Sequence, residues 1–145
     1  MTTPDLRCDD DELVHHQDEA PIDISTAFQC ARCGIIYAFR TQRNFKIHTV
    51  FALLAIVLAA LFQVDLGSWL AILLCIAMVY ALEMLNTAVE AVVDLVSPGW
   101  NELAKRAKDC AAGAVYIAAI GSLFVAAFIF IPRIADLVAL LIQGQ

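Results

Sequence analysis

The chain has 145 residues, of which 61% are apolar and 17% are charged, and its mean hydropathy is +0.77. Ordinary soluble domains are about 45–50% apolar and about 25% charged, so a chain of this length cannot bury so much apolar surface in a water-soluble globule. The net charge of −6 is concentrated at one end, because residues 1–25 carry eight acidic residues against one arginine. The remainder is nearly neutral and has no large basic face, so we expect no nucleic-acid partner.

The acidic segment, residues 1–25, has the high charge and few aromatic residues that are typical of a disordered tail. Residues 26–46 follow it and combine bulky apolar side chains with arginines and a lysine. This composition predicts an amphipathic helix that lies on the membrane surface, with a simple juxtamembrane anchor as the alternative.

Three uncharged or nearly uncharged stretches follow, over residues 47–64, 66–93 and 110–132. A helix needs about 20 apolar residues to cross the hydrocarbon core of a bilayer, so each stretch is long enough. The stretches are rich in alanine and leucine and do not alternate polar with apolar residues, which disfavours membrane strands. The sequence therefore predicts an all-α membrane protein in which the surface helix precedes three transmembrane helices. Residues 135–145 are expected to form a short interfacial or partner-packing segment.

Basic residues flank the predicted spans unevenly. They are Arg32, Arg40, Arg43 and Lys46 before the first span, and Lys105, Arg106 and Lys108 between the second and third. Because cytoplasmic loops carry the excess of lysine and arginine, we expect the N-terminus and the second link in the cytoplasm and the C-terminus outside.

A stripe of polar residues occupies the second half of the second span: Glu83, Asn86, Thr87, Glu90 and Asp94. At 100° per residue these positions share one helix face about 100° wide. Carboxylates inside a membrane are costly and usually face a protein interior or a functional site. Packing hydrogen bonds between helices are the alternative, although three acids on one face repel one another.

Depth separates two of these carboxylates. Counting about 20 residues inward from Trp69 puts Glu83 within the hydrocarbon and Glu90 at its inner edge. The two lie about 10.5 Å apart along the helix axis, too far to bind one Mg²⁺ ion together. We therefore expect Glu83 to accept the proton of a lipid hydroxyl and Glu90 to hold a metal ion that arrives from the cytoplasm.

The second link holds a predicted turn at residues 97–100 and then the basic residues Lys105, Arg106 and Lys108, followed by Asp109. Cationic side chains beside carboxylates at the membrane edge would suit a polyphosphate carried with magnesium, with lipid-headgroup anchoring as the alternative. No P-loop, kinase glycine loop or dinucleotide fingerprint occurs.

These motifs resemble those of the bacterial diacylglycerol kinase/undecaprenol kinase family over residues 26–134. The matching positions are Glu83-x-x-Asn86-Thr87-Ala88-x-Glu90-x-x-x-Asp94, then Ala104-Lys105-x-Ala107-Lys108-Asp109-x-Ala111-Ala112-Gly113-Ala114-Val115, and the segment Arg43-Asn44-Phe45-Lys46-Ile47-His48. The resemblance implies a small trimeric membrane kinase with active sites shared between neighbouring subunits. It also implies transfer of the γ-phosphate of ATP, with Mg²⁺, to a membrane lipid alcohol in the bacterial cell membrane.

The resemblance further implies roles for individual residues: Glu83 as general base, Glu90 as a magnesium ligand, Asn86 near the reacting groups, and Lys108, Asp109, Gly99, Trp100 and Asn101 as nucleotide contacts. Two departures stand out. Gln42 occupies the position of the family's second magnesium-binding carboxylate, and an amide oxygen is the weaker ligand. The turn at Gly99 and Asn101 lacks the acidic residue and the histidine that many members carry there.

Two functions remain open from the sequence. The first is a lipid kinase. The sequence of residues 95–98 and 111–115 resembles the undecaprenol kinase branch of the family more closely, which favours undecaprenol over diacylglycerol as the substrate. The second is a degenerate, catalytically weak member that acts as a membrane interaction or assembly subunit, and Gln42 is its main support.

Overall fold

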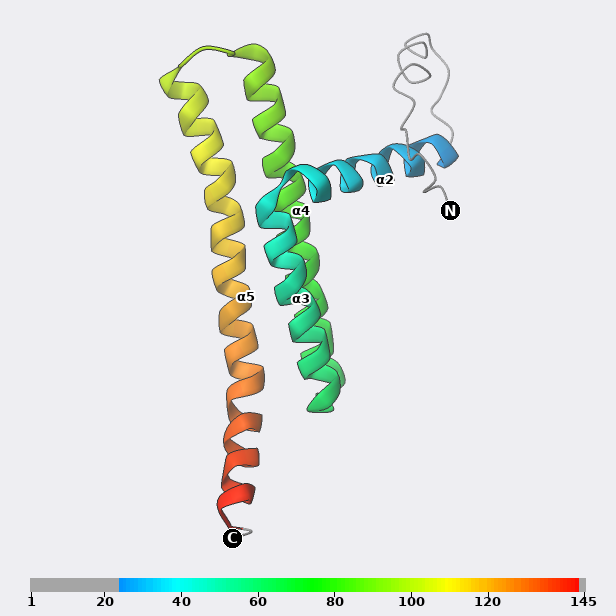
Figure 1. The fold of residues 1–145 in the computed structure, drawn as a ribbon, viewed down its shortest axis with the longest axis vertical. Helices are drawn as coiled ribbons and strands as arrows, with labels where there is room; N and C mark the ends of the chain where they lie inside the picture. Colours follow the sequence, from blue (N-terminus) through cyan, green and yellow to red (C-terminus); the bar gives the residue numbers. More distant parts are fainter. Residues whose placement is uncertain (1–23, 144–145) are drawn as a thin grey trace, which may run out of the picture. The chain divides into compact units, whose positions relative to one another are not determined.

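A computed structural model describes residues 24–143 of the chain. These residues form four helices and no strand: α2 (Ile24–Thr41), α3 (Arg43–Leu61), α4 (Leu66–Val96) and α5 (Glu102–Gln143) (Figure 1). The all-α prediction is confirmed. The predicted disordered tail lies outside the described residues, apart from residues 24 and 25, which begin α2.

Three of the helices, α3, α4 and α5, are long and apolar enough to cross a membrane. They belong to one compact unit, Ala38–Gln145, in which α4 packs against both α3 and α5. Short links join consecutive helices, so α4 runs antiparallel to its two neighbours (Figure 1). Most of their large apolar side chains are exposed, as expected for helices surrounded by lipid.

The helix boundaries differ from the prediction near Gln42. The surface helix predicted over residues 26–46 corresponds to α2 but ends at Thr41, and residues 43–46 form the first turn of α3 instead. Gln42 separates the two helices because its backbone is extended, with φ −92° and ψ 118°. Its side chain does not cap α3 and instead donates a hydrogen bond to Glu90 on α4, so a tertiary contact accompanies the break.

The link between α3 and α4 is a compact turn. The backbone N–H of Gln63 donates to the carbonyl of Ala60, and that of Val64 donates to the carbonyl of Ala59. This pair of bonds is the Schellman arrangement, in which the residue at the Gln63 position takes a left-handed conformation. Gln63 has φ 47°, a region that a residue with a Cβ atom adopts at a cost.

Replacing this strained residue with glycine should stabilise the protein. We expect Gln63→Gly to raise the free energy of unfolding by about 0.5–1 kcal/mol, because glycine adopts positive φ without the steric cost. Thermal unfolding in a fixed lipid or detergent environment measures the change, and Gln63→Ala is the matched control that should bring no gain. Equal midpoints for the glycine and alanine variants would contradict the expectation.

Asp65 is the N-cap residue of α4 and also contacts α5. Its carboxylate accepts hydrogen bonds from the hydroxyl and the backbone N–H of Ser68, at 2.7 and 3.0 Å, and pairs with Arg133 at 3.2 Å. The Ser68 hydroxyl, followed by the Ser68 backbone N–H, holds the pKa of the Asp65 carboxyl below its ordinary value. The carboxylate that caps α4 therefore remains charged.

An apolar core lies at the same end of the three-helix unit. It consists of the buried residues Ala59, Val64, Ile72, Ile129 and Phe130.

The helix that contains the third predicted span continues beyond that span. The sequence suggested a span that ends near Pro132 and a separate segment over residues 135–145, whereas α5 continues through Pro132 to Gln143. Proline lacks the N–H of an ordinary helical residue. The next residue, Arg133, adds side-chain contacts at this point: its Nη1 donates to the carbonyl of Ile129 at 2.6 Å and its Nη2 donates to Asp65 at 3.2 Å.

Candidate active site

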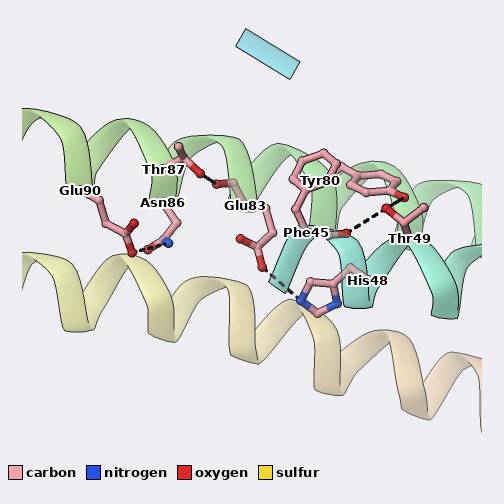
Figure 2. Close-up of polar contacts among 8 residues, drawn as sticks. All are labelled: Phe45, His48, Thr49, Tyr80, Glu83, Asn86, Thr87 and Glu90. Carbon is pink, nitrogen blue, oxygen red and sulfur yellow. Dashed lines mark hydrogen bonds and ion pairs between the residues drawn. The ribbon is translucent and has the colours of Figure 1, made fainter. Parts of the chain in front are cut away.

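The predicted polar stripe lies on α4 and includes the most buried polar side chains that the structure describes. Glu83 is 1% exposed, Asn86 is 6% exposed and Thr87 is 7% exposed. The Thr87 hydroxyl donates to the carbonyl of Glu83 at 2.9 Å, so Thr87 is satisfied within its own helix (Figure 2). Glu83 and Asn86 instead line a hollow between the helices, as expected for costly polar groups in a membrane protein.

Glu83 faces α3, where its nearest polar neighbour is His48. The distance from His48 Nε2 to Glu83 Oε1 is 3.2 Å (Figure 2). The contact lacks hydrogen-bond geometry, so Glu83 Oε1 is buried without a hydrogen-bond partner. His48 had no predicted role from the sequence. In the sequence His48 is noticeable only as a polar residue near the start of an otherwise apolar span. That position does not reveal its partner on another helix.

Glu90 joins two residues that the sequence linked to metal and substrate. Gln42 Nε2 donates to Glu90 Oε2 at 3.1 Å, and Asn86 Nδ2 donates to Glu90 Oε1 at 3.0 Å. The structure thus brings Gln42 and Glu90, the two predicted magnesium ligands, into direct contact although they are 48 positions apart.

The residues around Glu90 suit a weakly held divalent cation. No group of three or more histidine, cysteine, aspartate or glutamate side chains gathers into a metal cage among residues 24–143. Mg²⁺ commonly binds through one or two carboxylates together with substrate phosphates and water, so a complete protein cage is unnecessary. Glu90 would supply one carboxylate to such an ion, and the amide oxygen of Gln42 would be a second ligand if the amide turned over. The donor set therefore fits Mg²⁺ bound together with a phosphate ligand.

A hollow of about 390 Å³ lies between α3, α4 and α5 beside Glu83 and Asn86. It is lined by Asn44 and His48 of α3, Glu83 and Asn86 of α4, and Ala112, Gly113, Val115, Tyr116 and Ala119 of α5. Two buried oxygen atoms in it, Glu83 Oε1 and Asn86 Oδ1, have no hydrogen-bond partner. Buried polar atoms normally have a partner, so these two acceptors indicate a ligand that brings a donor, such as a hydroxyl group.

An apolar groove of about 380 Å³ adjoins the hollow. His48 and Ala119 line both spaces, and the remaining groove residues are Phe51, Ala52, Leu54, Ala55, Leu58, Ile72, Cys75, Ile76, Val79, Tyr80, Ser122, Leu123, Val125, Ala126 and Phe130. The two spaces together suit a molecule with a hydroxyl end and a long hydrocarbon body.

The residues predicted to contact a nucleotide lie beyond this cluster and are mostly exposed. Lys108 pairs with Asp94, one turn beyond Glu90 on α4, and so connects α5 to α4 near the proposed metal ligands. Asp109 pairs with Lys105 of its own helix at 3.5 Å. Trp100 is 85% exposed and makes no contact that indicates a role.

Asn101 has a structural role in the same turn. Its Oδ1 accepts hydrogen bonds from the backbone N–H groups of Leu103 and Ala104, at 2.8 and 3.2 Å, and so caps α5. A Cβ added at Gly99 would meet no atom within 4 Å, so the glycine is not required by packing. The structure does not bring Gly99, Trp100, Asn101 or Asp109 to Glu83 and Glu90, and their nucleotide roles remain predictions.

Comparison with known proteins gives the family. Residues 29–130 match the family model described as prokaryotic diacylglycerol kinase. The chain belongs to this family. It is 45% identical over 112 residues to a diacylglycerol kinase of Synechocystis sp., a match that covers 77% of this chain and 64% of that protein, just under two thirds of its length.

Two further relatives carry different names. An undecaprenol kinase of Bacillus subtilis is 39% identical over 108 residues, covering 74% of this chain and 88% of that protein. A diacylglycerol kinase of Escherichia coli K12 is 37% identical over 87 residues, covering 60% of this chain and 71% of that protein. The family and the names of these relatives indicate a lipid kinase and do not separate the two lipid alcohols.

Proposed function

We propose that this prokaryotic diacylglycerol kinase family member transfers the γ-phosphate of ATP, with Mg²⁺, to the hydroxyl of a membrane lipid alcohol. The observation that carries the proposal is the pair of unpartnered buried acceptors, Glu83 Oε1 and Asn86 Oδ1, at the place where a polar hollow meets an apolar groove. A lipid alcohol supplies the missing donor with its hydroxyl and fills the groove with its hydrocarbon.

Glu83 is the proposed general base. Its Oε1 contacts His48 but accepts no hydrogen bond, so it can take the hydroxyl proton as the hydroxyl oxygen attacks the phosphoryl group. His48, 3.2 Å away, borders both the hollow and the groove and so limits where the hydroxyl end can lie. Asn86 supports the arrangement, because its amide nitrogen orients Glu90 while its oxygen faces the hollow.

Glu90 and Gln42 are the proposed holders of Mg²⁺, which, when bound, neutralises charge on the phosphates. Phosphoryl transfer depends mainly on positioning and charge stabilisation, so the protein needs acceptors and cations at fixed places more than covalent chemistry. Lys108 forms an ion pair with Asp94, one turn from Glu90. It is the proposed cation for the nucleotide phosphates. Asp109, Gly99, Trp100 and Asn101 are proposed as further nucleotide contacts by family resemblance.

The groove favours undecaprenol as the acceptor. Both hydroxyl groups that line it already donate to protein acceptors, Tyr80 to the Thr49 hydroxyl and Ser122 to the carbonyl of Ala118. Diacylglycerol carries two ester groups close to its hydroxyl, and their carbonyl oxygens would meet no free hydroxyl there. A polyprenol carries only hydrocarbon behind its hydroxyl, so it loses nothing in such a groove.

Membrane orientation and assembly are part of the proposal. The basic residues that flank the spans support an orientation with the N-terminus and the α4–α5 link on the cytoplasmic side, where ATP is available. Family resemblance implies a homotrimer in which neighbouring copies complete each site. The C-terminus then lies outside the bacterial cell membrane.

Phosphorylation of purified protein in lipid nanodiscs tests the function. Radiolabelled ATP is supplied with undecaprenol, with diacylglycerol, or with neither, and the extracted lipid product is counted. We expect label in lipid only when an alcohol is added, and more label in undecaprenol than in diacylglycerol. No lipid-dependent transfer at any Mg²⁺ concentration would refute the proposal and favour the alternative of an assembly subunit, for which Gln42 is the supporting observation.

Gln42→Glu tests the metal assignment. We expect the Mg²⁺ concentration for half-maximal rate to fall several-fold, roughly three- to tenfold, because a carboxylate replaces an amide oxygen. Gln42 Nε2 lies 3.1 Å from Glu90 Oε2, so two carboxylates would repel there without a cation, and the variant should also become less heat-stable unless Mg²⁺ is present. Gln42→Ala is the control that removes the amide without adding charge. An unchanged Mg²⁺ profile would contradict the assignment.

A further inference from the structure

We infer that the hydrogen bond between Tyr80 and Thr49 positions α3 against α4 while the residues of the site change partners, an inference that rests on the proposed function. In the part of the chain that the structure describes, three polar contacts join α3 and its N-cap residue to α4: Gln42 with Glu90, His48 with Glu83, and Thr49 with Tyr80. They follow one another in antiparallel order, so all three require the same register of α3.

The first two contacts involve groups that the proposed reaction uses. Glu90 Oε2 accepts the Gln42 amide, so the amide has to turn when that carboxylate and amide oxygen hold a cation. The charge of Glu83 changes when it takes a proton, which alters its attraction to His48. Neither contact can therefore hold the helices in a constant register through a catalytic cycle.

The third contact joins two neutral hydroxyl groups that take no part in the proposed phosphoryl transfer. The Tyr80 hydroxyl donates to Thr49 Oγ1 at 3.0 Å, and the Thr49 hydroxyl donates to the carbonyl of Phe45 at 2.8 Å (Figure 2). The ring of Tyr80 also packs on that of Phe45, with centroids 4.8 Å apart and planes 32° apart. Phe45 is 6% exposed, so this chain of contacts anchors the first two turns of α3 in a protected place.

The anchor is next to the reacting groups along both helices. Thr49 directly follows His48, and Tyr80 precedes Glu83 by three residues, close to one helical turn. A small shift of α3 at Thr49 would displace His48 relative to Glu83 and Gln42 relative to Glu90. Displacements on the scale of 1 Å at a reacting centre cost about 100-fold in rate, so a partial loss of this register is measurable.

Kinetics of hydroxyl-deletion variants test the inference. Thr49→Val and Tyr80→Phe each remove one partner and nearly preserve shape. Each should lower kcat by about tenfold and raise the Mg²⁺ concentration for half-maximal rate about threefold, with the KM for the lipid alcohol within about twofold of the parent. The double variant should be no worse than Thr49→Val alone, because the same bond between the helices is lost in both, and Thr49→Ser, which keeps the hydroxyl, should have parental values.

Val64→Ala is the control for a merely structural effect. Val64 is 7% exposed at the opposite end of the α3–α4 pair, away from the site, so its truncation should lower the thermal midpoint and leave the Mg²⁺ dependence unchanged. Amide hydrogen exchange gives a readout independent of activity. Thr49→Val should speed exchange about three- to tenfold in residues 43–50, and Val64→Ala should not.

Three results would overturn the inference: parental kcat and Mg²⁺ dependence in both hydroxyl-deletion variants, multiplicative losses in the double variant, or unchanged exchange in residues 43–50. A parent protein that phosphorylates no lipid alcohol would refute the proposed function instead. In that case the exchange data still decide whether the Tyr80–Thr49 bond holds α3 in place.

Discussion

Glu83→Gln should reduce kcat by about 100- to 10,000-fold and leave the protein folded. The amide has nearly the shape of the carboxyl group but cannot accept the hydroxyl proton. Glu83 is 1% exposed and its Oε1 has no hydrogen-bond partner, so the substitution breaks no hydrogen bond at that atom. The substitution removes both the desolvation cost of a buried carboxylate and its ion pair with His48, so we expect a thermal midpoint close to that of the parent.

The measurement combines phosphorylation of the lipid alcohol with thermal unfolding and with the apparent affinity for ATP in the presence of Mg²⁺. That affinity should stay close to parental, because Glu83 accepts a proton and contacts no phosphate. Glu102→Gln is the matched control. Glu102 is an exposed carboxylate that pairs with Arg106 on α5, outside the site, and its variant should retain parental activity. Substantial turnover by Glu83→Gln would remove Glu83 from the role of general base.

Glu90→Gln should also inactivate the enzyme, with a different kinetic signature. We expect a loss of at least about 100-fold at low Mg²⁺, because the carboxylate that neutralises the cation is gone. Part of the rate should return at high Mg²⁺ or with Mn²⁺, whereas neither addition should rescue Glu83→Gln. The contrast separates a metal ligand from a proton acceptor.

The structure adds a further consequence of Glu90→Gln. Glu90 accepts hydrogen bonds from Gln42 at 3.1 Å and from Asn86 at 3.0 Å, and a glutamine side chain has only one acceptor oxygen. One of these two contacts should therefore be lost, with a modest fall in thermal midpoint. Titration with Mg²⁺ measures both the concentration required for half-maximal rate and the change in thermal midpoint. A parental Mg²⁺ requirement with a reduced kcat would exclude Glu90 as a metal ligand.

Much of the proposed site could be found before the fold was known, because its residues belong to one helix. The spacing of Glu83, Asn86 and Glu90 places them on one face of any α-helix, whatever surrounds it. The same holds for the three spans, since their length and composition are local properties of the chain.

Contacts between helices were not accessible in this way. The sequence linked Gln42 to Glu90 only by family resemblance, and it assigned no role to His48 or to the Tyr80–Thr49 bond. The meeting of two residues on different helices depends on the register and rotation of each helix, which no periodicity within one segment determines. Asn101 illustrates the reverse case, because a residue expected at a nucleotide is engaged in capping α5.

The sequence by itself determined that this protein has three helices long and apolar enough to cross a membrane and that one of them carries its polar residues on one face, because hydrophobic length and helical periodicity are set by each segment alone. Only the tertiary structure decided where α2 ends, how α5 passes Pro132, and which face of α3 meets Glu83. Contacts with side chains that are distant in the chain accompany these features, namely Glu90 with Gln42, Asp65 with Arg133 and His48 with Glu83. Packing between helices, rather than local propensity, selects those partners.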